Sequence, residues 1–176
     1  MELLELEIST SRLLLQTISI KYKEDIFREF NQTITSYMYT KPAKHISETE
    51  DFINESLSDI KKGENLVLVI LNKNSFKFLG CTVIQEINSN EPEIGIWLKQ
   101  SAHGKGYGLE TIIGLKTWAE ENLDFQHLVY CADKANIPSR RIPEKLGGKI
   151  IREYNKTNLS GRVLNILEYV IPKARD

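Results

Sequence analysis

Three glycines alternate with other residues in the segment His103-Gly104-Lys105-Gly106-Tyr107-Gly108, which constrains the fold more than any other part of the chain. A strand pattern over 93–98 precedes this segment, and a helical pattern over 108–122 follows it. A glycine-rich turn that enters a helix points successive backbone N–H groups into one concavity, with the positive end of the helix dipole behind them. Such a concavity prefers phosphate oxygens. The segment therefore predicts a phosphorylated ligand, and an ordinary tight turn is the alternative interpretation.

The spacing of this segment excludes two common phosphate loops. A Walker A loop needs Ser or Thr after Gly-Lys, but Gly106 follows Lys105. The dinucleotide fingerprint needs a further glycine where Leu109 stands, and it needs a parallel βαβ unit that the preceding hairpins do not supply. The predicted phosphate site is therefore of another kind.

Strand and helix patterns alternate along the rest of the chain, which predicts an α+β fold around a mixed sheet. Strands are expected at 12–16, 66–71, 76–87, 93–98, 127–132, 149–154 and 164–171, and helices at 23–30, 48–62, 108–122 and 139–146. No repeat or linker interrupts the pattern, so residues 1–176 are expected to form a single domain.

Two of the expected helices have well-marked faces. Ser47-Glu48-Thr49-Glu50 predicts a capping box before the helix over 48–62, and Gly63 predicts its end. The inward positions are expected to be Phe52, Ile53, Leu57 and Ile60 in that helix, and Leu109, Ile112, Ile113, Leu115 and Ala119 in the helix over 108–122.

The composition excludes several classes of protein. Lys and Arg number 23 against 24 Asp and Glu, and a net charge of -1 disfavours nucleic acid and acidic membranes as partners. Cys81 and Cys131 lie in apolar stretches and are expected to be buried free thiols. The acidic N-terminus does not look like a signal peptide, and the aliphatic run 66–71 is too short to span a bilayer, so a cytoplasmic location is expected. The three histidines are far apart, which predicts no metal site.

Four segments, in this order along the chain, resemble the GNAT superfamily of N-acetyltransferases. They are Glu93–Leu98, His103–Glu110, Asn136-Ile137-Pro138-Ser139 and Glu144-Lys145-Leu146-Gly147. Within the superfamily they are most similar to the branch that acetylates the N-termini of ribosomal proteins, and Thr10-Ser11-Arg12-Leu13 looks like the first strand of that branch. The resemblance implies a mixed, mostly antiparallel sheet that is splayed at its centre and flanked by helices. It also implies acetyl-CoA as cosubstrate, and homodimers occur in this branch.

The resemblance also implies which residues bind the cofactor. The backbone amides of His103, Gly104, Lys105, Gly106, Tyr107 and Gly108 would hold the coenzyme A pyrophosphate. Ile96 and Leu98 would pair with the pantetheine arm, and the Leu98 N–H would donate to the thioester carbonyl. Asn136 would either anchor the same arm or cap the helix over 139–146.

Catalytic residues follow from the same likeness. Ser139 matches a serine near the coenzyme A sulfur, where it can donate to the departing thiolate, and a helix N-cap is its alternative role. Many other members use a tyrosine four residues later, where this chain has Pro143, and Gly148 replaces a usual phenylalanine. Glu93 is the first candidate for the general base and Glu153 the second.

The expected reaction is direct attack of a primary amine on the acetyl thioester, without a covalent enzyme intermediate. Three kinds of amine are candidates: a protein N-terminus, a polyamine and a small molecule. The acceptor site is expected beside Tyr37, Tyr39, His45 and Trp97. Two alternatives stay open. One is a domain that binds coenzyme A as a sensor or structural subunit, without turnover. The other is an aminoglycoside-type acetyltransferase, which needs an acidic acceptor pocket, whereas the acidic clusters at 48–51 and 120–121 look like solvated helix faces.

Overall fold

The computed structural model of the protein describes residues 2–174 and is built around one eight-stranded sheet, in the order β1-β2-β3-β4-β5-β6-β8-β7. The strands are β1 (Glu7–Ser9), β2 (Leu13–Thr17), β3 (Leu66–Asn72), β4 (Phe78–Gln85), β5 (Glu93–Leu98), β6 (His127–Asp133), β7 (Lys149–Thr157) and β8 (Val163–Pro172). The α-helices are α1 (Lys23–Glu29), α2 (Ile46–Lys62), α3 (Tyr107–Asn122) and α4 (Ile137–Lys145). Only the β5–β6 pair is parallel. The α+β class and the mixed, mostly antiparallel sheet are therefore confirmed.

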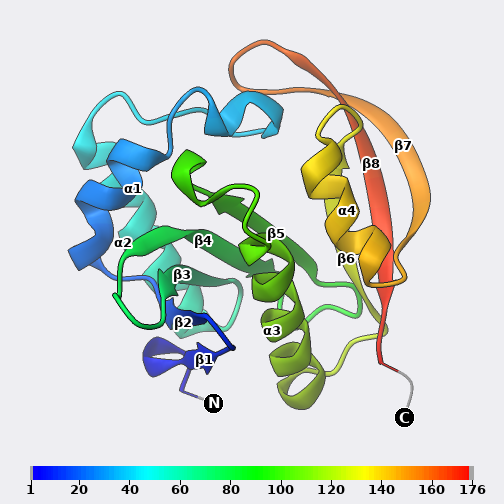
Figure 1. The fold of residues 1–176 in the computed structure, drawn as a ribbon, viewed down its shortest axis with the longest axis horizontal. Helices are drawn as coiled ribbons and strands as arrows, with labels where there is room; N and C mark the ends of the chain where they lie inside the picture. Colours follow the sequence, from blue (N-terminus) through cyan, green and yellow to red (C-terminus); the bar gives the residue numbers. More distant parts are fainter. Residues whose placement is uncertain (1, 175–176) are drawn as a thin grey trace.

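Helices cover both faces of the sheet. Phe30, after α1, packs on Trp97 of β5 with ring centroids 4.9 Å apart. A Cβ built at Gly108, in α3, would lie 3.8 Å from Cδ1 of the next strand residue, Leu98. Neighbouring strand residues point to opposite faces, so α1 and α3 lie on opposite sides of β5. Figure 1 shows α4 beside α3, in front of β6 and β8. Between these layers the aliphatic run Leu66–Leu71 of β3 is at most 7 % exposed, as its composition predicts for a strand buried on both faces.

The sheet opens between β5 and β6. β4 and β5 pair continuously from Gly80↔Leu98 to Gln85↔Glu93, whereas β5 and β6 pair only at Glu93↔Val129. Beyond that pair the two strands diverge toward Leu98, which confirms the expected splay. The opening leaves one edge of β5 without a strand partner directly before the glycine-rich segment.

The ends of the elements differ from the prediction by up to three residues, and one strand was not predicted. Strand β4 is two residues shorter than expected at each end, and β7 is three residues longer at its C-terminal end. Strand β1 was not expected; it is only three residues long, and β2 is its one strand partner among residues 2–174. Helix α2 begins at Ile46 with His45 as N-cap and no side-chain cap, so Ser47 lies inside the first turn and the predicted capping box is wrong. The predicted end at Gly63 is confirmed, with φ +71°. Helix α4 begins two residues earlier than expected.

Two predicted inward positions are also wrong, because an apolar residue at the margin of a helical stripe is not always covered by the sheet. Phe52 of α2 is 43 % exposed and Ile113 of α3 is 46 % exposed. The buried face of α2 takes Thr49 and Ser56 in addition to Ile53 and Ile60.

Among the described residues, no helix is long and apolar enough to cross a membrane.

Candidate active site

The glycine-rich segment forms an open turn with unused backbone donors. Gly104 and Gly106 have φ of +73° and +79°, in the left-handed region that favours glycine. Within residues 2–174, none of the amides of residues 104–109 donates a hydrogen bond. They lie at the N-terminus of α3, where the helix dipole adds partial positive charge. The turn therefore has the donors and the field that an anion such as a phosphate needs.

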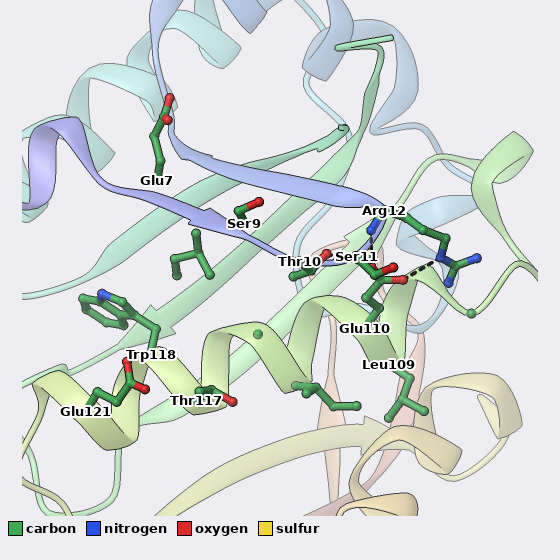
Figure 2. Close-up of a pocket in the computed structure, with 14 residues that line it drawn as sticks. Glu7, Ser9, Thr10, Ser11, Arg12, Leu109, Glu110, Thr117, Trp118 and Glu121 are labelled. Atoms are coloured by element: carbon green, nitrogen blue, oxygen red, sulfur yellow. Dashed lines mark hydrogen bonds and ion pairs between the residues drawn. The ribbon is translucent and has the colours of Figure 1, made fainter. Parts of the chain in front are cut away.

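Arg12, in the turn between β1 and β2, holds this segment from outside. Its Nη1 donates to the Lys105 carbonyl at 2.9 Å, and its guanidinium carbon lies 4.7 Å from the centroid of the Tyr107 ring. Its Nε donates to Glu110 Oε2 at 2.7 Å, as Figure 2 shows. The helical pattern over 108–122 does not count Glu110 among its inward positions, and the Thr10–Leu13 motif gives no role to Arg12, so neither contact was predicted.

Glu110 is held in its charged form by the same turn. Partial burial alone would raise the pKa of Glu110, but hydrogen bonds from the Thr10 hydroxyl, the Arg12 amide and the Arg12 side chain together lower it. The carboxylate accepts from Thr10 Oγ1 and from the Arg12 N–H at 2.7 Å each. This network ties α3 to the first two strands, so the start of α3 is fixed relative to the sheet.

The register of β4 and β5 directs two backbone amides into the opening. The Lys99 N–H donates to the Leu79 carbonyl at 2.8 Å. In an antiparallel ladder, donors alternate between the two edges, so the N–H groups of Leu98 and Ile96 point away from β4, toward the splay. The Leu98 carbonyl points the same way and lies 2.8 Å from His103 Nε2. The His103 side chain, from the glycine-rich segment, therefore also reaches the free edge of β5.

Ser139 lies in the first turn of α4 and faces β6. Its Oγ is 2.9 Å from the hydroxyl of Tyr130, which is 2 % exposed. Burial raises the pKa of Tyr130 to about 12, against a smaller opposing effect of the hydrogen bond to Ser139. Asn136 is the N-cap and its Oδ1 accepts from the Ser139 N–H at 3.4 Å, so the alternative N-cap role for Ser139 is wrong and Asn136 has the capping role.

Glu93 begins β5 at its pairing with Val129, just where the sheet opens. Its side chain shares a face with Trp97, opposite to the α3–α4 side. Burial raises the pKa of Glu93, with a smaller contribution from the charge of Glu168, and contact with the Cys131 thiol opposes the rise. Cys131 is a half-buried free thiol and Cys81 a buried one. A half-buried carboxyl group with a raised pKa therefore lies at the base of the splay.

Glu153, the second candidate for the base, is placed elsewhere. It pairs with Leu167 of β8, which in turn pairs with Ala132 of β6, so it lies on the α4 face, opposite to Glu93. Its carboxylate lies 2.8 Å from Lys134 Nζ, and this hydrogen bond lowers its pKa. The structure does not bring Glu153 together with Glu93.

The four residues expected at the acceptor side have different roles. Trp97 packs between Phe30 and Phe78, so it forms a wall of the Glu93 face. Tyr37 and Tyr39 lie in the segment between α1 and α2. The Arg162 guanidinium lies over the ring of Tyr37, and the Lys156 ammonium lies over the ring of Tyr39. His45 is exposed at the start of α2.

A surface hollow of about 790 Å³ lies between β1 and α3. Figure 2 shows its labelled residues, which include Thr10, Arg12 and Glu110. Of the glycine-rich segment it meets Gly106, and it is not the opening between β5 and β6. In the described part of the chain, no three His, Cys, Asp or Glu side chains gather as they would around a metal ion.

Comparison with known proteins agrees with this geometry. The acetyltransferase (GNAT) domain family matches residues 12–149. No curated protein matches the sequence significantly. Solved structures share the fold at low sequence identity. One is the acetyltransferase that modifies the N-terminal serine of ribosomal protein L7/L12 from Salmonella typhimurium, with 15 % identity, TM-score 0.83 and coverage of 95 % of this chain and 99 % of that one.

Two further structures were solved with ligands. The spermidine N-acetyltransferase from Vibrio cholerae, in complex with CoA and spermine, has 18 % identity, TM-score 0.81 and coverage of 93 % and 96 %. The microcin C7 self-immunity acetyltransferase MccE, in complex with acetyl-CoA and AMP, has 23 % identity, TM-score 0.80 and coverage of 92 % and 93 %. The splayed sheet and the glycine-rich turn agree with the family match over 12–149. That match establishes that this chain belongs to the GNAT acetyltransferase domain family.

Proposed function

We propose that the protein is an acetyl-CoA-dependent N-acetyltransferase that acts on a primary amine. The observation that carries this proposal is the row of unused amides at 104–109, beside an edge of β5 that has no strand partner after Glu93. Relatives of the same fold modify a protein N-terminal serine and spermidine, which supports an amine as the acceptor.

The residues present fit coenzyme A. The amides of the segment His103–Gly108 would bind the pyrophosphate, and Arg12 keeps the Lys105 carbonyl turned away from it. The free edge of β5 at Ile96 and Leu98 would pair with the amides of the pantetheine arm. When bound, acetyl-CoA supplies the acetyl group as a thioester. The Leu98 N–H would then donate to the thioester carbonyl, where negative charge develops during attack.

Glu93 and Ser139 suit the two proton transfers, because they lie on opposite faces of the opening. Glu93 would accept a proton from the amine, and its raised pKa brings it closer to the working pH, which favours a general base. Ser139 would donate to the departing sulfur from the α4 side, with its hydroxyl oriented by Tyr130. The amine would thus approach from the Glu93 face.

Calorimetric titration of acetyl-CoA tests the cofactor site. The wild-type protein should bind, and Gly106→Val should not, because the side chain is strained at φ +79° and its Cβ would lie 3.3 Å from Arg12 Nη2. Gly161→Val is the matched control: Gly161 also has positive φ, +84°, but a Cβ there meets nothing within 4 Å. A wild-type protein that binds no acetyl-CoA would overturn the proposal.

Thiol release in the presence of a panel of amines tests turnover. Transfer to any amine distinguishes an enzyme from a domain that only binds coenzyme A. Glu93→Gln should lower kcat without weakening acetyl-CoA binding, because Glu93 lies outside the segment 103–108. Binding of acetyl-CoA without transfer to any primary amine would leave the cofactor site standing and refute the proposed reaction.

A further inference from the structure

Two segments of the chain contain no acidic residue although the whole sequence has 24. One is 31–47, between α1 and the first turn of α2, and it contains Lys41 and Lys44. The other is 154–167, the loop between β7 and β8 with its flanks, and it contains Lys156 and Arg162. The excess of positive charge in both segments contrasts with a net charge of -1 for the chain.

The fold brings these two segments together. The Leu159 N–H donates to the Tyr39 carbonyl at 2.9 Å, and the Asn158 side chain donates to the Met38 carbonyl at 3.2 Å. The Arg162 guanidinium donates to the Ser36 carbonyl at 3.1 Å. Hydrogen bonds between segments more than 100 residues apart fix one cationic surface, which consists of Lys41, Lys44, Lys156 and Arg162.

The four cations have no acidic partner within residues 2–174, unlike Lys134 or Arg152 elsewhere on the surface. Lys156 lies 4.1 Å above the ring centroid of Tyr39, and Arg162 lies 4.8 Å above that of Tyr37. These contacts hold the Lys156 and Arg162 side chains in place. The charge of Lys156 also acts on Glu93, where it opposes the rise in the pKa of that carboxyl.

The two acids that flank the first segment in sequence form no ion pair with the ammonium groups of Lys41 and Lys44. Glu29 pairs with Arg28, and Glu48 accepts from the backbone amide of Lys44. The lysine ammonium groups are therefore available to a ligand.

A pocket of about 420 Å³ lies under this surface. Lys41, Lys44, Asn31, Gln32 and Ser160 supply its polar lining, and Phe27 and Phe30 are among its apolar residues. Phe30 packs on Trp97, which shares the face of β5 with Glu93. The pocket thus adjoins the side of the opening from which the amine would approach, and its charged lining is entirely positive.

We propose that the acetyl acceptor carries a negatively charged group, a carboxylate or a phosphate, which binds to Lys41 and Lys44 in this pocket while its amine reaches Glu93. The proposal rests on the proposed function and names its substrate class. The charges are complementary at both ends of such a molecule, because the cationic amine meets the half-buried carboxyl group of Glu93 and the anion meets the lysines. A polycationic acceptor, such as an aminoglycoside or a polyamine, would be repelled by the same surface.

Steady-state kinetics with matched amines tests the proposal. We would compare ω-amino carboxylates and aminoalkyl phosphates with α,ω-diamines of the same chain lengths, at saturating acetyl-CoA. The anionic member of each pair should have a kcat/KM at least about tenfold higher than the diamine. A tenfold ratio corresponds to about 1.4 kcal/mol. Because exposed charges are screened, this preference should shrink as ionic strength rises. The two anionic series distinguish a carboxylate from a phosphate site.

Lysine variants link the preference to the pocket. Lys41→Glu/Lys44→Glu should reverse the preference toward diamines, whereas Lys41→Arg/Lys44→Arg should keep it. Lys61→Glu is the matched control, because Lys61 is exposed at the far end of α2 and should leave the preference unchanged. All three lysines are exposed, so unchanged melting temperatures are expected for every variant.

The outcomes separate the two proposals. Diamines preferred by the wild-type protein, or a preference that Lys41→Glu/Lys44→Glu leaves unchanged, would overturn the anionic acceptor and leave the N-acetyltransferase standing. Transfer to no amine of either charge would overturn the N-acetyltransferase, and the anionic acceptor with it.

Discussion

The hydroxyl groups of Tyr130 and Ser139 lie 2.9 Å apart, and this contact connects the buried face of β6 to the first turn of α4. Burial raises the pKa of Tyr130 to about 12, so the phenol stays protonated at neutral pH. A neutral phenol cannot take the serine proton, but it can fix the direction of the serine hydroxyl. Ser139 is only half-buried, and the rest of its hydrogen-bonding capacity is open to a ligand.

Ser139→Ala should lower kcat by about 10- to 100-fold. This is a small effect for the loss of a general acid, because a thiol departs with little help. Tyr130→Phe should lower kcat less and cost about 1 kcal/mol of stability through the lost hydrogen bond. Acetyl transfer to a good acceptor measures the first effect and thermal unfolding the second. A Ser139→Ala protein with normal kcat and a lower melting temperature would assign the residue to α4 packing.

Arg12→Ala should weaken acetyl-CoA binding about tenfold, because the Lys105 carbonyl and the Tyr107 ring lose the group that positions the turn. Arg12→Lys should restore little, since one ammonium group cannot serve the carbonyl, the ring and Glu110 at once. Calorimetric titration measures the change.

Arg28→Ala is the control for Arg12→Ala. Arg28 is an exposed arginine that also pairs with acids, Asp25 and Glu29, but it lies on α1, away from the turn. Equal losses of acetyl-CoA affinity in the two variants would contradict a positioning role for Arg12.

The sequence predicts the fold class and the position of the site because both depend on local patterns. The strand pattern over 93–98, the alternating glycines over 103–108 and the helical pattern over 108–122 are each contained in fewer than 20 residues, whereas the splay of the sheet is implied by the family resemblance. The left-handed φ of Gly104 and Gly106 needs glycine, so residue type alone marks the turn. The family resemblance then adds the role of Ser139, which no local pattern assigns.

Features that depend on distant partners could not be predicted. Strand β1 is too short to show alternation and exists because it pairs with β2 and packs on α3. Glu110 has a typical solvent-facing spacing, and only the fold shows that Arg12 lies against it. The capping box at 47–50 fits the local rule, yet the helix starts at Ile46 and the Glu48 side chain instead accepts from the Lys44 amide.

Gly80→Ala should destabilise the protein by about 3 kcal/mol, which is at the upper end of the range that overpacking of a protein core usually costs. A Cβ at Gly80 would lie 2.1 Å from the Trp97 carbonyl oxygen and 2.8 Å from the Leu98 Cα, both backbone atoms of β5. The strand must move to accept the methyl group, so acetyl-CoA affinity should fall as well.

Chemical unfolding and calorimetry measure the two effects of Gly80→Ala. Gly95→Ala is the control for the added methyl group, because Gly95 lies in the same ladder without a left-handed φ and a Cβ there meets a side-chain methyl group, Val83 Cγ1, at 3.3 Å instead of backbone. A Gly80→Ala protein of unchanged stability would show that β4 and β5 separate easily at this point.

The raised pKa of Glu93 predicts opposite effects of pH on activity and stability. The base must be ionised, so kcat/KM should rise with pH through a limb above the ordinary glutamate range, separate from the limb of the amine itself. Between the ordinary pKa of Glu93 in the unfolded chain and its raised pKa in the folded state, the folded state binds more protons than the unfolded chain. The stability of the fold should therefore fall as pH rises through that window. Glu93→Gln should remove both the lower activity limb and this loss of stability.

Cys131→Ala separates the effect of burial from that of the neighbouring thiol. Burial is the main cause of the raised pKa of Glu93, and the Cys131 thiol opposes it, so removing the thiol should move the lower limb of the pH–rate profile to still higher pH. Cys81→Ala removes a buried thiol on β4, which is not among the groups that shift Glu93, and should leave the limb in place. A limb that moves equally in both variants, or that survives Glu93→Gln, would mean that another group is the base.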